Sequence, residues 1–192
     1  MRLWPRPDFL VNLGVTLNDS GRFDEADRVL HQAIAKKPDH AGAHAALAAT
    51  LAGQNRIEES VGEYELALRF NPGDASSECG LGVSLAMLRR FDDARKHFGN
   101  ALKLEPNYAT VYSNLGQMSA DQGRWEESAA HYRKALELNP ALAVAEANLG
   151  VALAQLQRFK EAAEHFRRAI ELNPDDAASR ANLAGVEKEL KK

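Results

Sequence analysis

Three histidines recur at intervals of 34 residues, at His97, His131 and His165. Imidazole is a frequent zinc ligand and proton carrier, so a periodic histidine column could indicate a metal site. A constant interval of this kind is typical of a structural repeat, and equivalent residues of stacked helical repeats lie about 10 Å apart, roughly one interhelical spacing. Zinc ligands lie only about 2 Å from the metal. We therefore predict no shared metal site and interpret these histidines as solvated residues of an outer face.

The other residues with catalytic chemistry lack suitable neighbours. Gly80 and Gly82 form at most half of a nucleotide-binding loop, and no predicted strand precedes them. Cys79 is the single cysteine, which excludes an internal disulfide framework, and it is best interpreted as a small apolar filler. The sequence thus predicts no catalytic residue, no cofactor and no metal, and we expect that the protein is not an enzyme.

A column of arginines occupies equivalent positions along the chain: Arg22, Arg56, Arg90, Arg124 and Arg158. Such a column could grip an acidic strand. The alternative is that each arginine is a solvated turn residue paired with nearby acids, a kind of ion pair that contributes little to stability. We favour the second interpretation.

Five prolines share the 34-residue period of these columns: Pro38, Pro72, Pro106, Pro140 and Pro174. A constant period of this length indicates one supersecondary unit that is copied and stacked. The sequence predicts a lead-in at 1–6, five repeats at 7–40, 41–74, 75–108, 109–142 and 143–176, and a capping helix at 177–192.

The spacing within a repeat is helical. Tyr112, Leu115, Gly116 and Ser119 fall at i, i+3, i+4 and i+7, which is one face of a helix. The Asp-Gln-Gly-Arg segment at 121–124 follows, and its glycine can adopt the left-handed conformation that ends a helix. A second periodic segment comes next. Each repeat is therefore predicted to be a pair of antiparallel helices.

This pattern resembles the tetratricopeptide repeat (TPR) family, which combines an aromatic, Leu-Gly, Tyr, Ala and Pro over one repeat. In the fourth copy these residues are Tyr112, Leu115, Gly116, Tyr132, Ala135 and Pro140. The resemblance covers residues 7–192 and implies an all-α, right-handed superhelical solenoid of 11 helices. Other copies depart from the pattern, with Leu10, His44, Glu78 and Glu146 in place of the early aromatic. Gly62, inside a helix of the second copy, predicts that this repeat is the least stable.

Composition limits the partners. The chain has 24 Lys and Arg against 27 Asp and Glu, a net charge of −3, without a basic block. Nucleic acid is therefore an unfavoured partner. No apolar run reaches the roughly 20 residues of a membrane span, so we predict no membrane insertion. The opening residues lack the apolar core of a signal peptide. We expect a cytoplasmic location, or an unknown one if the chain belongs to a longer protein.

TPR resemblance assigns partner binding to the concave face, which the first helix of each repeat lines. The expected groove residues are Asn12, Ala45, Ala49, Val83, Met87, Ser113, Asn114, Gln117, Asp121, Asn148, Val151, Gln155 and Asn182. Repeats two and three would form a wide apolar trough. Repeats four and five offer amides, which both donate and accept hydrogen bonds and suit an extended peptide backbone. This asparagine column is similar to that of O-GlcNAc transferase; the alternative is that the asparagines satisfy only local backbone groups.

A second TPR subclass clamps acidic C-terminal tails with lysine and arginine. Here the corresponding places include Asp8, Ala45 and Ser76, so that clamp is absent. The predicted function is a non-catalytic scaffold that binds a protein or an extended peptide, neutral to mildly basic. Two alternatives are a docking or regulatory domain of a larger enzyme, such as a membrane glycosyltransferase, and a self-assembling scaffold.

The two ends of the repeat array differ in sequence. The last predicted helix is apolar on one face and charged on the other, as a capping helix must be. Trp4, Phe9 and Leu10 instead crowd the first repeat with nothing before them. Either Trp4 folds back over the first helix, or a preceding repeat or another chain covers it, which would allow self-association.

Overall fold

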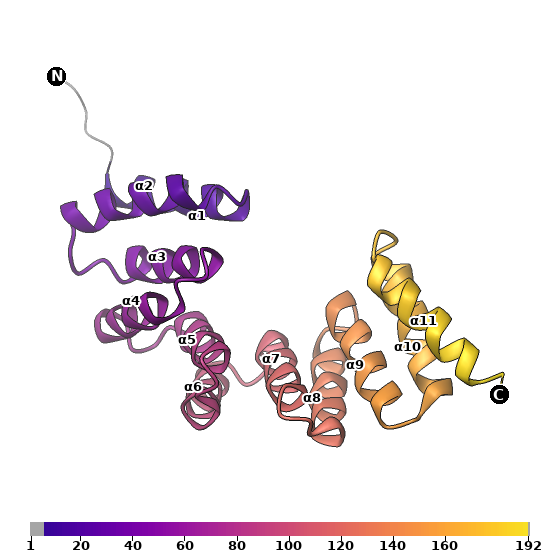
Figure 1. The fold of residues 1–192 in the computed structure, drawn as a ribbon. Helices are drawn as coiled ribbons and strands as arrows, with labels where there is room; N and C mark the ends of the chain where they lie inside the picture. The colour runs from indigo at the N-terminus through magenta and orange to yellow at the C-terminus, as the bar shows by residue number, and fades with distance from the viewer. Residues whose placement is uncertain (1–5, 192) are drawn as a thin grey trace. The chain divides into compact units, whose positions relative to one another are not determined.

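The computed structural model describes residues 6–191, which contain helices and no strand (Figure 1). The helices are α1 (Pro7–Asp19), α2 (Phe23–Lys36), α3 (Ala41–Gly53), α4 (Ile57–Phe70), α5 (Ala75–Met87), α6 (Phe91–Leu104), α7 (Ala109–Ala120), α8 (Trp125–Leu138), α9 (Ala143–Gln155), α10 (Phe159–Leu172) and α11 (Ala177–Glu189). The predicted all-α TPR solenoid with its 11 helices is confirmed over this range.

Each helix pair is joined by a short turn with one left-handed residue. These residues are Gly21 and Gly123 at φ 71°, Asn55 and Arg89 at 62° and Gln157 at 59°. The predicted left-handed glycine is present in the first and fourth repeats. In the other three, a residue with a side chain adopts the same conformation, so the packing of the two helices, and not glycine alone, fixes the turn.

Close contact between paired helices depends on small residues in the first helix. A Cβ atom added to Gly116 would lie 2.9 Å from the Tyr132 ring, and one at Gly150 would lie 2.7 Å from the Phe166 ring. Tyr132 and Phe166 are each only 1% exposed. The large ring of the second helix thus lies directly against the backbone of the first.

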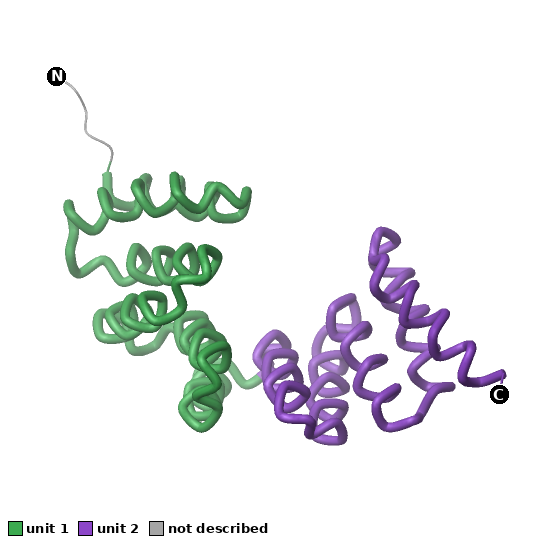
Figure 2. Tube along the Cα trace, viewed as in Figure 1, with its two compact units in different colours: residues 1–106 green, residues 107–192 purple. Residues whose placement is uncertain are grey.

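The chain divides into two compact units, Met1–Pro106 and Asn107–Lys192 (Figure 2). The division falls between the third and fourth repeats, so α1 to α6 belong to unit 1 and α7 to α11 belong to unit 2. The core of unit 2 includes Tyr132, Leu149, Leu153 and Phe166. In both units buried residues of the second helices meet buried residues of the next first helix.

The expectation of solvated histidines is wrong for His97 and His165. Each ring nitrogen Nδ1 lies 2.6 Å from a carboxylate oxygen of the first helix in its own repeat, Glu78 for His97 and Glu146 for His165. The two histidine side chains are only 23% and 28% exposed. The physical reason is the glutamate at the early aromatic position, because a carboxylate this buried needs a hydrogen-bond partner.

The second repeat contains the same pair in the opposite order. His44 stands on α3, is 5% exposed and lies 2.6 Å from Glu63 on α4. The sequence separation is 19 residues in all three cases. That recurring separation of His and Glu was the available sequence signal.

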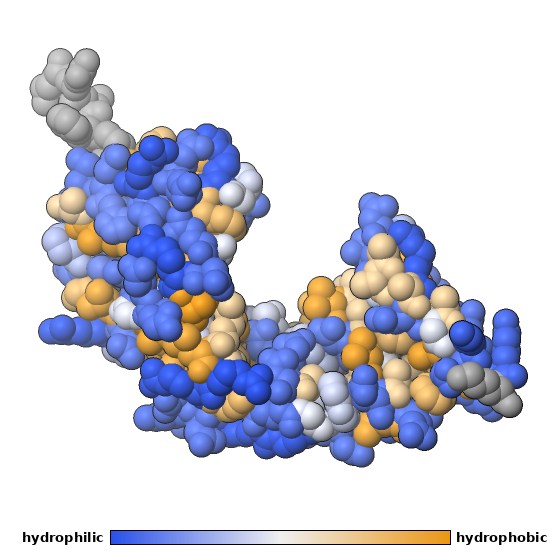
Figure 3. Space-filling view, viewed as in Figure 1, coloured by the Kyte–Doolittle hydropathy of each residue, from blue (hydrophilic) through white to orange (hydrophobic). Residues whose placement is uncertain are grey.

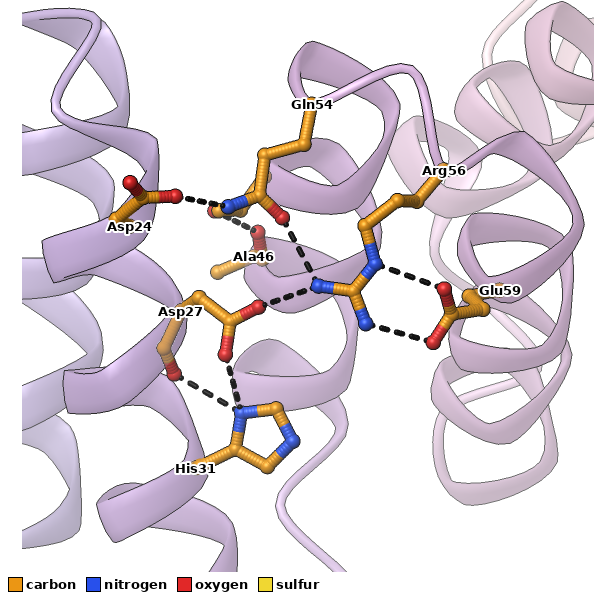
Figure 4. A network of polar contacts seen from close by, with 8 residues as sticks. Asp24, Asp27, His31, Ala46, Gln54, Arg56 and Glu59 are labelled. Atoms are coloured by element: carbon orange, nitrogen blue, oxygen red, sulfur yellow. Dashed lines mark hydrogen bonds and ion pairs between the residues drawn. The ribbon is translucent and has the colours of Figure 1, made fainter.

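The arginines of the column pair with acids of the same chain, as expected for turn residues. Every member lies within ion-pair distance of an acid three residues later: Arg22–Glu25, Arg56–Glu59, Arg90–Asp93, Arg124–Glu127 and Arg158–Glu161. Figure 4 shows that Arg56 also reaches back to Asp27 of the preceding repeat, at 2.9 Å. Hydrogen bonding from Arg56 lowers the pKa of Glu59. The i,i+3 pairs lie within one repeat, whereas the Arg56–Asp27 pair joins two repeats; such exposed pairs add little stability.

Candidate binding groove

A cluster of polar side chains lies between the first helices of repeats four and five. Gln117 of α7 donates from Nε2 to Asp121 Oδ1 at 2.8 Å. Its Oε1 accepts from the Tyr132 hydroxyl at 3.2 Å and from Asn148 Nδ2 at 3.5 Å. We call Gln117, Asp121, Tyr132 and Asn148 the polar cluster. It joins three helices of unit 2, and it presents both donors and acceptors to the groove.

The Tyr132 hydroxyl remains protonated in this setting. Burial raises the pKa of Tyr132, a hydrogen bond with Asn148 opposes the rise, and the Asp121 carboxylate adds to it. The hydroxyl therefore stays neutral and can donate to Gln117 at any physiological pH.

Two adjacent cavities open beside the polar cluster. The first, of about 170 Å³, is the polar cavity, lined by Gln117, Ala120, Asp121, Trp125, Tyr132, Asn148 and Val151. The second, of about 220 Å³, is the apolar cavity, lined by Val151, Ala154, Gln155, Phe166, Ala181, Asn182, Gly185, Val186 and Glu189. Figure 3 shows apolar side chains reaching the surface of unit 2 over α9 and α11. Both cavities lie within unit 2 and share Val151.

The thirteen predicted groove residues all retain accessible surface, and none is buried. The structure brings Gln117, Asp121 and Asn148 together at the polar cavity. Gln155 and Asn182 lie at the apolar cavity, and Val151 lies at both. The remaining residues stand elsewhere on the first helices: Asn12, Ala45, Ala49, Val83 and Met87 in unit 1, and Ser113 and Asn114 on α7. A binding role for any of them stays a prediction.

In unit 1 the expected apolar trough is partly filled by the chain itself. A Cβ atom at Gly53 would lie 2.4 Å from the Phe23 ring, and one at Gly80 would lie 2.3 Å from the Tyr64 ring. Cys79 is 6% exposed, in agreement with its interpretation as a filler. Because these glycines carry no side chain, rings from the second helices occupy the space above them.

Three aromatic residues of unit 2 line the cavities and were not among the expected groove residues. They are Trp125 and Tyr132 at the polar cavity and Phe166 at the apolar one. The rings of Tyr132 and Phe166 are buried between helices, against Gly116 and Gly150. The hydroxyl of Tyr132, which Phe166 lacks, was the sequence signal for its role in the polar cluster, since a buried hydroxyl needs a hydrogen-bond partner.

The ends of the array contrast in polarity. On α1, Phe9 is 60% and Leu13 38% exposed. The residues at the same repeat positions in α3, Ala43 and Leu47, are 0% and 1% exposed. Leu10, which was expected at the same uncovered surface, is only 3% exposed because it packs against Ala33 and Ala43. On α11 the outward residues are polar or small, including the exposed Arg180. Trp4, which could cover α1, lies outside the described residues.

Within residues 6–191, no group of three or more His, Cys, Asp or Glu side chains is placed to hold a metal ion. None of the helices described is long and apolar enough to cross a membrane.

Comparison with known families agrees with the repeat geometry. Three tetratricopeptide repeat models match residues 17–77, 79–143 and 143–176. The chain belongs to the tetratricopeptide repeat family, whose fold generally serves as a non-catalytic scaffold for protein–protein interaction. No curated protein matches the sequence.

Solved structures share the fold at low sequence identity. The Cut9–Hcn1 hetero-tetramer of the APC/C matches with a TM-score of 0.88 and 19% identity over 97% of this chain, which spans only 37% of that chain. A thermophilic TPR protein of Thermus thermophilus matches with a TM-score of 0.81 and 21% identity, covering 94% of this chain and 98% of that one. YrrB, described as a TPR protein with an unusual peptide-binding site, has a TM-score of 0.63 and 22% identity, covering 90% and 89%. At such identities the likeness establishes the fold alone.

Proposed function

We propose that the protein is a non-catalytic scaffold that binds an extended segment of a partner protein in the groove of unit 2. The observation that carries this proposal is the polar cluster beside two cavities. Gln117 and Asn148 present amides at the polar cavity, and Val151 separates that cavity from an apolar one. An extended peptide needs both features, because its backbone requires hydrogen bonds while its side chains require pockets.

Charge and energetics define the partner further. The residues that line the two cavities include the acids Asp121 and Glu189 and no lysine or arginine. A neutral to mildly basic segment is therefore favoured over an acidic one. Each neutral hydrogen bond contributes only about 0.5–1.5 kcal/mol net, so the affinity must come from many contacts and will be modest.

A double substitution, Asn114→Ala with Asn148→Ala, tests the proposal. We expect weaker binding of a partner, identified by pull-down and mass spectrometry, with an unchanged helical circular dichroism spectrum. Asn12→Ala is the matched control, because Asn12 holds the same repeat position on α1 of unit 1. Unchanged affinity in the double variant, or preferred binding of acidic C-terminal peptides, would contradict the proposal.

A second candidate function is self-assembly through α1. Phe9 and Leu13 are exposed at positions that are buried in α3 under the preceding repeat. The opposite end of the array, α11, presents Arg180 and other polar residues, so head-to-tail stacking is disfavoured. We infer a closed dimer in which the α1 faces of two copies meet across a two-fold axis.

Light scattering over a concentration series tests this dimer. We expect a monomer–dimer equilibrium that Phe9→Ser with Leu13→Ser abolishes. Val144→Ser is the control, because Val144 is 67% exposed and lies on α9, away from the end of the array. A protein that stays monomeric at high concentration, or that forms an open-ended series of oligomers, would exclude the two-fold dimer.

A further inference from the structure

We propose that the polar cavity of unit 2 binds a lysine or arginine side chain of the partner, and that the apolar cavity receives an apolar side chain about three residues away. The inference rests on the proposed binding of an extended segment. It goes further because it assigns a chemical class of side chain to each cavity and a distance between them.

The polar cavity has the chemistry that a cation requires. Asp121 supplies a carboxylate, and its Oδ1 is already oriented by the amide of Gln117 at 2.8 Å. The Tyr132 hydroxyl oxygen, whose proton is donated to Gln117, adds a neutral acceptor. Trp125 lines the same cavity, and an indole face attracts ammonium and guanidinium groups.

The apolar cavity adds a second requirement for the partner, an apolar side chain beside the basic one. Val151, Phe166 and Val186 line it, and Val186 is only 6% exposed. An aliphatic or aromatic side chain that enters this cavity removes apolar surface from water, which favours binding. The affinity of a basic segment should therefore depend on an apolar residue as well as on its charge.

The spacing follows from the repeat. The two cavities share Val151 and occupy successive positions along unit 2, about 10 Å apart if they follow the interhelical distance. An extended chain in the polyproline II conformation advances about 3.1 Å per residue and completes one turn every three residues, so side chains three positions apart point to the same side. A basic residue and an apolar residue separated by two others would thus reach both cavities together.

Unit 1 contains a natural contrast at the same repeat positions. Gln117 and Asn148 correspond to Ala49 and Gly80, and Trp125 corresponds to Ile57. Asp121 corresponds to Gly53 in the second repeat. These positions of the second and third repeats therefore lack the carboxylate, the amides and the indole, and we expect no preference for a basic side chain there.

Asp19 provides the matched control. It occupies the same repeat position as Asp121, at the end of α1, but Val15 stands where unit 2 has Gln117. Asp19→Asn removes the same charge from the chain as Asp121→Asn without touching the polar cavity. The two variants therefore separate a local effect at the cavity from a general change in net charge.

The experiment selects binders to the full chain from a displayed library of random eight-residue peptides. Wild type, Asp121→Asn and Asp19→Asn are compared. We expect wild type and Asp19→Asn to enrich peptides with Lys or Arg three positions from an apolar residue. Asp121→Asn should lose the basic preference, and a selected peptide should bind that variant about fivefold more weakly. Val151→Asn should lose the apolar preference.

The outcomes distinguish this inference from the proposed function. Enriched peptides without a basic residue, or a basic preference that Asp121→Asn retains, would overturn the assignment of the polar cavity while leaving peptide binding intact. Equal losses in Asp121→Asn and Asp19→Asn would also overturn it, since the effect would then be one of net charge. Failure to enrich any sequence would overturn both the inference and the proposed function.

Discussion

Tyr64 in unit 1 and Tyr132 in unit 2 hold the same repeat position but face different surroundings. The Tyr64 ring covers Gly80, at which a Cβ atom would lie 2.3 Å away. The Tyr132 hydroxyl instead donates to Gln117, near Asn148. Gly80 and Asn148 are equivalent positions, and so are Ala49 and Gln117, so amide side chains surround the tyrosine hydroxyl in unit 2 and not at the equivalent positions of unit 1.

This contrast shows how a repeat protein separates stability from specificity. The buried contacts are nearly the same in both units, since Leu81 and Leu149 are 1% and 0% exposed at one shared position. The groove positions differ, because they contribute little to the core and tolerate glycine, alanine or an amide. Substitutions at equivalent core positions should therefore have similar effects in the two units, and substitutions at positions whose contacts differ should not.

The largest expected effect concerns the core, where the units should behave alike. A Cβ atom at Gly82 or Gly150 would lie 2.7 Å from the Phe98 or Phe166 ring, both 1% exposed. Because these rings cannot move aside cheaply, Gly82→Ala and Gly150→Ala should each reduce the free energy of unfolding by about 2–3 kcal/mol. Urea denaturation followed by circular dichroism measures this.

Gly62→Ala is the matched control for these substitutions. Gly62 lies inside α4, and nothing is within 4 Å of its added Cβ atom. The change should raise the free energy of unfolding by about 0.5–1 kcal/mol, because alanine favours the helix. A loss of stability in all three variants would show that contact with a neighbouring ring does not determine which glycines tolerate alanine.

The next effect concerns the buried His–Glu pairs, which occur in both units. Glu78→Ala in unit 1 and Glu146→Ala in unit 2 should each cost about 1–2 kcal/mol, because the histidine loses the hydrogen bond at 2.6 Å. The exchange Glu146→His with His165→Glu should recover most of the loss, since repeat two has this order at His44 and Glu63. Failure of the exchange would indicate that the reversed pair depends on its local setting.

Sequence alone predicted most of the fold because the period encodes it. Leu-Gly pairs and prolines fix helix positions through local steric rules, and the helices of the described residues follow the same period. Side-chain pairing was less accessible. Glu146 and His165 come from different helices, so their meeting depends on the angle between those helices, which no local pattern specifies.

The candidate groove was predicted only in outline. Asn148 and Gln117 were expected in the groove; in the structure their side chains lie 3.5 Å apart, and their role in binding stays a prediction. The contribution of Trp125 and Tyr132 to the polar cavity was missed. An aromatic side chain that packs against the core with one side can also line a cavity with the other. Which rings do both depends on the side chains opposite them, a property of three helices and not of one repeat.

A smaller effect should change sign between the units. Ser60 and Ser128 share a repeat position and are both 0% exposed. Ser60 Oγ lies 3.0 Å from Ser84 Oγ, whereas Ser128 Oγ has no hydrogen-bond partner among the described residues. Ser60→Ala should therefore destabilise the protein by about 1 kcal/mol, and Ser128→Ala should stabilise it by about 1 kcal/mol.

Thermal and urea unfolding of these two serine variants measure the difference. Ala162, at the same repeat position, is 0% exposed and shows that alanine fits there. Changes of the same sign in both variants would mean that the unpaired hydroxyl of Ser128 is satisfied by water, and that the two units do not differ at this site.

The smallest effect concerns the last helix of unit 2, whose N-cap is a carboxylate. Ser179 donates its hydroxyl to Asp176 Oδ2 at 2.5 Å and its backbone N–H to Oδ1 at 3.0 Å. These bonds, the hydroxyl first, hold the pKa of Asp176 below its ordinary value of 3.8. A lowered pKa means that the folded state prefers the ionised form, so the cap is fully effective above pH 3.8 and is lost as the pH falls further.

Hydrogen exchange of the α11 amides should therefore quicken below this pH in the wild type, after correction for the intrinsic exchange rate. Asp176→Asn should remove most of that dependence, because asparagine also caps a helix but does not titrate, and its effect at neutral pH should be below about 1 kcal/mol. Parallel pH profiles in the two proteins would locate the acid sensitivity of unit 2 outside this cap.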